Sequence, residues 1–207
     1  MHSRRQLLGW GAASTAALAF PTLSFAQPGK ALGKNGKKTM KKVVTNGRLK
    51  QSVSRWCYGK IKLPELCEVA KKLGYQSVEL LGPKEIEEVK KAGLTCAMMR
   101  CASIEKGLNR KENHDRIVKE LTDHIEFAAA NQVPSVICMS GNRGKLDDEE
   151  GLKTCAAGLK RVMALAEKKK VNVVMEGLNS KVDHKDYMYD RTPWGVKLCK
   201  LVGSDRF

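Results

Sequence analysis

The segment NVVMEGLN, residues 172–179, places a glutamate directly after four nearly apolar residues. A run of this kind predicts a buried strand, and Glu176 then stands where that strand ends. A carboxylate against an apolar wall can both take and return a proton, so this placement favours general acid–base chemistry. Glu176 is therefore our candidate catalytic residue. In a purely structural alternative, it caps the next turn or pairs with Lys181.

Four other residues follow predicted strands closely enough to contact a substrate. Asn179 and His184 come after the same run and could hydrogen-bond substrate hydroxyls, although a turn-capping asparagine and a surface histidine fit the pattern as well. Trp56 could form an apolar wall of a pocket or simply pack. Glu79 ends another apolar run and could serve the site or form a salt bridge.

Short apolar runs alternate with amphipathic helical patterns from residue 51 onward, and this alternation sets the fold class. The predicted strands are 52–57, 77–82, 95–101, 135–141 and 172–179. The predicted helices begin at Pro64, at Pro83 and near Asn113, and two more cover the stripe 152–166 and residues 194–203. Continuous apolar strands between amphipathic helices indicate an α/β fold with a parallel sheet covered by helices.

Two architectures fit this alternation: a doubly wound open sheet and a (β/α)8 barrel. The first run is followed by neither GxGxxG nor GxxxxGK[ST], so a nucleotide-binding open sheet loses its best support. Polar residues gather at the carboxyl ends of the strands, which is where barrel enzymes place their chemistry. These residues are Arg55, Trp56, Glu79, Arg100, Ser140, Asn142, Glu176 and Asn179. The pattern favours a barrel.

The stretches SVELLG, VICMSGN and, above all, VVMEGLNSKVDHKDYM followed by TPWGVKLCKLVGS resemble the hydroxypyruvate isomerase group. That group is part of the xylose isomerase-like TIM barrels, within the sugar phosphate isomerase and epimerase superfamily. The resemblance covers residues 51–207, and Glu176 to Tyr187 is its most specific part. Family members usually carry an aliphatic residue before the glutamate and often a proline after it, where this chain has Met175 and Gly177.

The resemblance implies that Glu176 is one of two acidic residues that move protons. In metal-dependent relatives this glutamate also ligates a divalent cation, so a Mg²⁺ or Mn²⁺ ion on Glu176 is implied as well. In the family, the sixth to eighth strands bring an aspartate, a histidine or glutamine, and the second catalytic glutamate, and none of these lies in this sequence. A barrel of this kind needs roughly 250 residues. We therefore expect a partial barrel of about five β/α units, truncated after the fifth.

The implied reaction interconverts hydroxypyruvate and tartronate semialdehyde, or a related ketose and aldose, through an enediol. A divalent ion would stabilise the enediolate as a Lewis acid. A sugar epimerase of the same superfamily and a truncated, non-catalytic fragment are the alternatives. A fragment would expose parallel strand edges, which a second copy could cover in a homo-oligomer.

Residues 1–26 fit a twin-arginine export signal. Arg4 and Arg5 precede an apolar stretch, and Ser24-Phe25-Ala26 offers a peptidase site. The apolar stretch is too short to span a bilayer, and no later segment is apolar enough. We therefore expect a periplasmic protein without a stable membrane span.

The net charge of +16 is concentrated outside the expected barrel. Residues 28–50 hold eight basic residues and no acidic one, whereas residues 51–207 hold 28 basic and 22 acidic residues. We expect residues 27–50 to form a basic flexible linker. Abasic-site endonucleases share this barrel but need several histidine and acidic ligands, and we expect His114 and His124 at the surface or flank. The expected partner is a small sugar or hydroxy acid, not nucleic acid.

Seven cysteines occur, an odd number without a CxxC pair, so no disulfide framework is predicted. We expect mostly buried free thiols. Cys57 is the one expected to be reactive.

Overall fold

Strands and helices alternate along the described chain, which comprises residues 41–100 and 103–207 of a computed structural model. The expected export signal, residues 1–26, and residues 27–40 of the expected linker lie outside the described residues and stay predictions. The elements in chain order are β1 (Ser52–Ser54), η1 (Arg55–Tyr58), α1 (Leu63–Leu73), β2 (Ser77–Glu79), α2 (Pro83–Lys91), β3 (Thr95–Cys96), η2 (Lys111–Asn113), α3 (His114–Asn131), β4 (Ser135–Cys138), α4 (Asp148–Lys169), β5 (Asn172–Met175) and α5 (Thr192–Val202). Among the described helices, none is long and apolar enough to cross a membrane.

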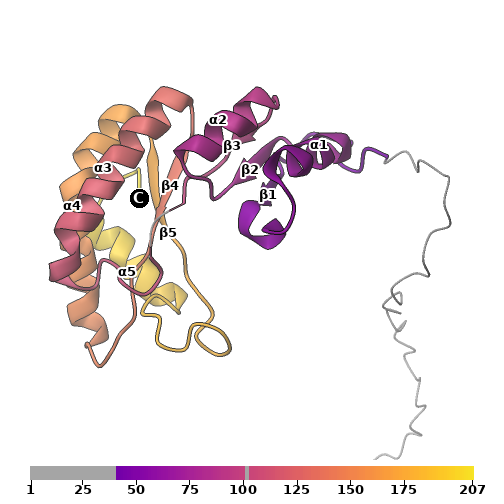
Figure 1. The fold of residues 1–207 in the computed structure, drawn as a ribbon. Helices are drawn as coiled ribbons and strands as arrows, with labels where there is room; N and C mark the ends of the chain where they lie inside the picture. The colour runs from indigo at the N-terminus through magenta and orange to yellow at the C-terminus, as the bar shows by residue number, and fades with distance from the viewer. Residues whose placement is uncertain (1–40, 101–102) are drawn as a thin grey trace, which may run out of the picture. The chain divides into compact units, whose positions relative to one another are not determined.

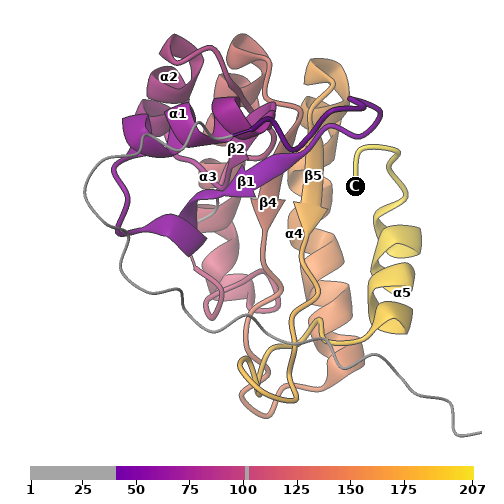
Figure 2. The ribbon, with the colours of Figure 1, turned by 90° about the vertical axis from the view of Figure 1, so that its right-hand side faces the viewer.

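The strands pair in parallel and in chain order. β1, β2 and β3 form one sheet, and β4 pairs with β5 (Figures 1 and 2). Parallel bridges from Met99 to both Leu81 and Val136 join the two sheets. A doubly wound open sheet would reverse its strand order at a switch point. The order β1 to β5 therefore confirms the expected partial (β/α)8 barrel.

Backbone groups on both edges of β5 have partners. The Asn172 N–H donates to the Pro134 carbonyl (2.9 Å), and the Val173 N–H donates to the Arg206 carbonyl (2.7 Å). Successive amides of a strand point to opposite edges, so Arg206 lies where the next strand of a barrel would pair. The Arg206 guanidinium also donates to Asn172 Oδ1 (3.0 Å).

All five strands are shorter than the apolar runs predicted. The first predicted strand, 52–57, leaves the ladder after Ser54, and its end forms a 3-10 turn in which Arg55 Nη1 donates to the Tyr58 carbonyl (2.7 Å). The third, 95–101, is a strand only over Thr95–Cys96. The apolar runs continue past the ladders because their last residues enter the loops at the carboxyl edge.

The helices bury one apolar face each, and α4 also has a side-chain cap at its N-terminus. α3, α4 and α5 lie side by side (Figures 1 and 2). The Asp147 side chain accepts the N–H groups of Glu149 and Glu150 at the start of α4 (2.9 and 3.1 Å). The core includes Val78, Leu81, Ile86, Met99, Leu121, Ile125, Leu152, Leu159 and Leu198.

His114 is buried, so the expectation that it lies at the surface or flank was wrong. Its Nε2 lies 2.9 Å from the Leu108 carbonyl oxygen. The ring also packs against Gly158 of α4, where a Cβ would lie 3.0 Å from Nε2. The packing of α4 against the ring buries it, and the histidine acts as a polar core residue. His124 is half-buried on the same helix.

The described cysteines are placed largely as expected. Cys67, Cys96 and Cys155 are buried free thiols, whereas Cys57 and Cys199 are free and exposed. Burial raises the pKa of Cys96 to about 11 and also raises that of Cys155. Exposure therefore makes Cys57 and Cys199 more accessible to reagents than the buried thiols.

Gly107 lets a loop cross the carboxyl end of β4 at very short range. A Cβ on Gly107 would lie 2.2 Å from the Gly141 nitrogen and 2.5 Å from the Met139 carbonyl oxygen. The loop is fixed there because the Leu108 and Asn109 amides donate to the carbonyls of Met139 and Ser140 (3.1 and 2.8 Å).

We predict that Gly107→Ala destabilises the protein, because backbone atoms rather than a flexible side chain must move. The free energy of unfolding in urea should fall by about 1–3 kcal/mol. Gly59→Ala is the matched control, because its Cβ would lie 3.8 Å from the nearest atom and its φ is −56°. That control should stay within about 0.5 kcal/mol of the unmodified protein. Equal stability of both variants would contradict the close approach.

Candidate functional site

A cavity of about 450 Å³ opens among the carboxyl ends of the strands. Its apolar wall comes from Leu80 after β2, Ile104, Ile137 and Met139 at β4, and Leu178 after β5. The polar lining consists of Arg55, Arg100, Glu176 and His184, and Trp56 completes it. An apolar cavity with a few convergent polar groups, at the catalytic edge of a barrel, is the usual form of a small-molecule site.

The structure brings three of the five candidate residues to this cavity. Glu176, His184 and Trp56 line it, and Trp56 is 74% exposed. Glu79 is half-buried at the end of β2, pairs in register with Ser54, and is not among the lining residues.

Asn179 caps a turn, as in the structural alternative to a role in substrate binding. Its Oδ1 accepts the Lys181 N–H (2.9 Å), and its carbonyl accepts the His184 N–H (3.0 Å). Asn179 does not line the cavity. Its side chain acts on the site through the loop that carries His184.

Glu176 is exposed, which corrects the expectation of a carboxylate at a buried strand end. The reason is that β5 ends at Met175, so Glu176 is the first residue of the loop. Its backbone is nevertheless fixed, because the Tyr187 hydroxyl donates to the Glu176 carbonyl (3.0 Å). The carboxylate is therefore reachable from solvent while its Cα is held at the cavity mouth.

Tyr187 is fully buried and ties β5 to β4. Its hydroxyl oxygen accepts a hydrogen bond from the Ser140 N–H (3.0 Å), and the same hydroxyl donates one to the Glu176 backbone carbonyl. Burial raises the pKa of Tyr187, so the hydroxyl keeps the proton that it donates. The Ser140 hydroxyl in turn accepts the Tyr189 N–H (3.0 Å).

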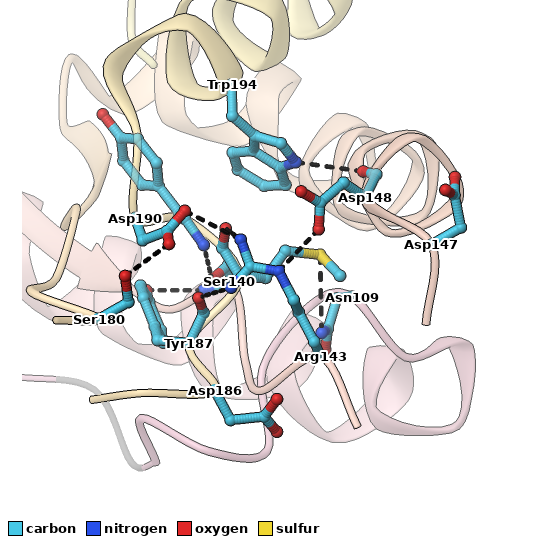
Figure 3. A network of polar contacts seen from close by, with 12 residues as sticks. Asn109, Ser140, Arg143, Asp147, Asp148, Ser180, Asp186, Tyr187, Asp190 and Trp194 are labelled. Carbon is cyan, nitrogen blue, oxygen red and sulfur yellow. Dashed lines mark hydrogen bonds and ion pairs between the residues drawn. The ribbon is translucent and has the colours of Figure 1, made fainter. Parts of the chain in front are cut away.

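An arginine organises the rest of the loop between β5 and α5 (Figure 3). Arg143 lies between two carboxylates, with Nε 2.7 Å from Asp148 Oδ1 and Nη2 2.9 Å from Asp190 Oδ1. Its guanidinium also donates to the carbonyls of Tyr187 and Met188. We call Arg143, Asp148, Asp190 and the two carbonyls the Arg143 cluster.

Asp190 is the most buried charged side chain of this cluster, at 9% exposure. Burial opposes its charge, but hydrogen bonds from Ser180 Oγ (2.6 Å) and from Arg143 outweigh that cost and lower the pKa of the carboxyl. The cluster is therefore charged at neutral pH and holds the loop that carries Glu176 and His184.

The sequence pattern does not mark Tyr187, Arg143 and Asp190 as residues that shape the site. The contacts that join the loop to β4 and to Arg143 span 44 to 47 residues of sequence. The density of polar residues in DHKDYMYD, residues 183–190, was the one available signal.

The ligand set for a divalent cation at the cavity is incomplete in the described part of the chain. Glu176 is the one carboxylate among the cavity-lining residues, and His184 is the one imidazole. Residues 41–100 and 103–207 contain no group of three or more His, Cys, Asp or Glu side chains that could hold a metal ion. The described residues therefore do not fit the implied ion.

We predict that Tyr187→Phe lowers the free energy of unfolding by about 1–3 kcal/mol, because the buried Ser140 N–H and the partly buried Glu176 carbonyl lose their partner. Urea unfolding measures the loss. Tyr58→Phe, at a 42% exposed tyrosine, should change stability by less than about 0.5 kcal/mol. A Tyr187→Phe protein as stable as the Tyr58→Phe control would refute the bridging role.

We also predict a loss of stability in acid that depends on Asp190. Its folded pKa lies below the unfolded value of about 3.9, so its contribution is full above that pH and disappears as pH falls through the folded pKa. Urea unfolding at several pH values from about 5 downward should show a shallower decline for Asp190→Asn. Asp183→Asn, at an exposed carboxyl in the same loop, should keep the original slope; an unchanged slope for Asp190→Asn would contradict the prediction.

Comparison with solved structures finds the same fold in several proteins. AP endonuclease, family 2, from Brucella melitensis is 18% identical with a TM-score of 0.61, over 76% of this chain and 66% of that chain. D-psicose 3-epimerase from Clostridium cellulolyticum H10 is 16% identical with a TM-score of 0.61, over 76% and 61%. IolI protein with a binding zinc atom is 15% identical with a TM-score of 0.62, over 76% and 60%.

The chain thus spans about 60–66% of the length of these structures, and identities this low show the fold alone. No curated protein sequence matches the chain. Residues 67–207, more than half of the chain, match the family described as xylose isomerase-like TIM barrel. With its strands in barrel order and its cavity at their carboxyl ends, the chain belongs to the xylose isomerase-like TIM-barrel family.

Proposed function

We propose that the protein is an isomerase of the hydroxypyruvate isomerase type, which interconverts hydroxypyruvate and tartronate semialdehyde. The observation that carries the proposal is the position of Glu176: a carboxylate at the mouth of an apolar-walled cavity, on the catalytic edge of the barrel. The resemblance of the sequence from Glu176 to Tyr187 to that isomerase group supports the choice of substrate.

In the proposed reaction, the Glu176 carboxylate takes a proton from C3 of hydroxypyruvate, next to the carbonyl. The bonding electrons move into a C2–C3 double bond and the carbonyl oxygen takes up a proton, which gives an enediol. Return of a proton to C2 and loss of one from the C3 hydroxyl gives the aldehyde, so atoms and electrons balance. A carboxylate can perform such transfers because it alternates between base and acid.

Glu176 supplies one proton carrier, and a complete shuttle uses a second acid. Among the described residues that line the cavity, His184 is the other group that can exchange protons. Tyr187 and the Arg143 cluster act indirectly, because they hold the loop on which both residues stand.

A sugar epimerase is the second candidate, and the similarity in fold to D-psicose 3-epimerase favours it. An epimerase would remove and return the proton at one carbon, whereas an isomerase returns it to the neighbouring carbon. The purified protein should be incubated in D2O with hydroxypyruvate and, separately, with D-psicose. Deuterium at C2 of tartronate semialdehyde supports the isomerase, and D-fructose deuterated at C3 supports the epimerase.

We predict that Glu176→Gln lowers the rate of hydroxypyruvate isomerisation by roughly 10²- to 10⁴-fold, because glutamine can neither accept nor return the proton. The rate is measured by following tartronate semialdehyde formation. The exposed Glu87 on α2 provides a control of equal charge change, and Glu87→Gln should leave the rate unchanged. Full activity of the Glu176→Gln protein would remove the basis of the proposal.

A further inference from the structure

Two arginines from different strand ends share a single carboxylate at the edge of the cavity. Arg55 follows β1 and Arg100 follows β3, and both line the cavity. Arg55 Nε lies 3.9 Å from Glu85 Oε1, and Arg100 Nη1 lies 3.6 Å from Glu85 Oε2. Two positive charges and one negative charge leave this group with a net charge of +1.

Glu85 is held in this place by the start of α2. Its Oε2 accepts the Gly82 N–H (2.9 Å), a donor at the helix N-terminus that has no backbone partner within the helix. The carboxylate therefore has a structural role and cannot follow either arginine into the cavity. Both arginine–glutamate distances exceed the 2.7–3.2 Å of a normal hydrogen bond, so Glu85 attracts the guanidiniums but leaves their N–H groups to bind elsewhere.

The two arginines differ in how they are held. Arg55 is 19% exposed and is anchored because its Nη1 donates to the Tyr58 carbonyl (2.7 Å). Arg100 is 60% exposed and lies against Gly82, where a Cβ would be 3.3 Å from Nη2. The glycine thus makes room for the Arg100 guanidinium beside the cavity.

We infer that Arg55 and Arg100 form a carboxylate-binding subsite, so that the cavity takes a short hydroxy or oxo acid rather than a neutral sugar. This inference rests on the proposed function and names the substrate class of the same site. A planar guanidinium pairs with a carboxylate through two parallel N–H donors, and a second anion would neutralise the surplus charge. Leu80 and Ile104 line the same cavity and give it an apolar wall beside the two arginines.

The test compares two ligands that differ in one group. Hydroxypyruvate and dihydroxyacetone share a hydroxyl and a carbonyl, but hydroxypyruvate has a carboxylate where dihydroxyacetone has a hydroxymethyl group. Isothermal titration should use protein that carries Glu176→Gln, so that turnover does not disturb the binding measurement. In that background, hydroxypyruvate should bind at least about tenfold more tightly than dihydroxyacetone.

Adding Arg100→Gln should weaken hydroxypyruvate binding by roughly 10- to 100-fold and leave dihydroxyacetone binding unchanged. Arg161→Gln, which removes an equal charge from a surface ion pair with Asp115, should change neither affinity. Arg55→Lys should give an intermediate loss, since it keeps the charge without the planar donors. Circular dichroism checks that each variant is folded.

Equal affinities for hydroxypyruvate and dihydroxyacetone would overturn the inference. An Arg100→Gln protein that binds hydroxypyruvate as tightly as the Glu176→Gln background would overturn it as well. The proposed function fails separately. Absence of isomerisation by the unmodified protein, together with arginine-dependent binding, would remove the activity and retain the subsite. Isomerisation with no dependence of KM on Arg100 would retain the activity and remove the subsite.

Discussion

The site depends on one buried hydroxyl group, that of Tyr187. The β4–β5 ladder ends at the pair Cys138–Met175. Directly past this pair, the two segments no longer form backbone hydrogen bonds with each other. Tyr187 supplies an acceptor for the Ser140 N–H and a donor for the Glu176 carbonyl, so it replaces the missing ladder bonds with one side chain. Unpaired backbone groups in this apolar surrounding would be costly. The candidate proton carrier thus stands at a defined place although its own carboxylate is exposed.

The loop between β5 and α5 is held mainly by contacts with a charged side chain, Arg143. The chain between β5 and α5 contains no regular element, and Arg143 binds it through the Asp190 carboxylate and two backbone carbonyls. Asp148, the first residue of α4, pairs with the same guanidinium. A guanidinium has five N–H donors in a fixed plane, so it can serve several acceptors at once, which a lysine ammonium cannot do with the same geometry. The stacked rings of Tyr189 and Trp194 (5.4 Å) join this loop to α5. The strand ends and the loop are therefore two parts of a single support for the cavity.

Periodicity predicted the elements because it records local packing. The buried positions of α3, Ile117, Leu121 and Ile125, follow the helical spacing closely. Strand ends were predicted too late, since an apolar run continues past the strand into the cavity wall, as Met139 after β4 shows. Glu176 could be located from its place after such a run. The burial of His114 and the roles of Tyr187 and Arg143 could not, because each depends on a contact with a distant part of the chain. These contacts are with Gly158, Ser140 and Asp190, in that order.

The positions of the two arginines also affect how easily a proton could be removed from hydroxypyruvate, which is already an anion. Hydroxypyruvate carries one negative charge, and removal of a proton from C3 places more negative charge on the neighbouring oxygens. Repulsion between these charges would raise the barrier in a cavity with apolar walls, where screening is weak. A surplus positive charge near the substrate carboxylate offsets that repulsion, and both guanidiniums already lie beside Glu85 at the edge of the cavity before substrate binds. On this argument, the Arg55–Arg100 pair does more than select acids over neutral sugars: it lowers the cost of the enediolate that Glu176 would create.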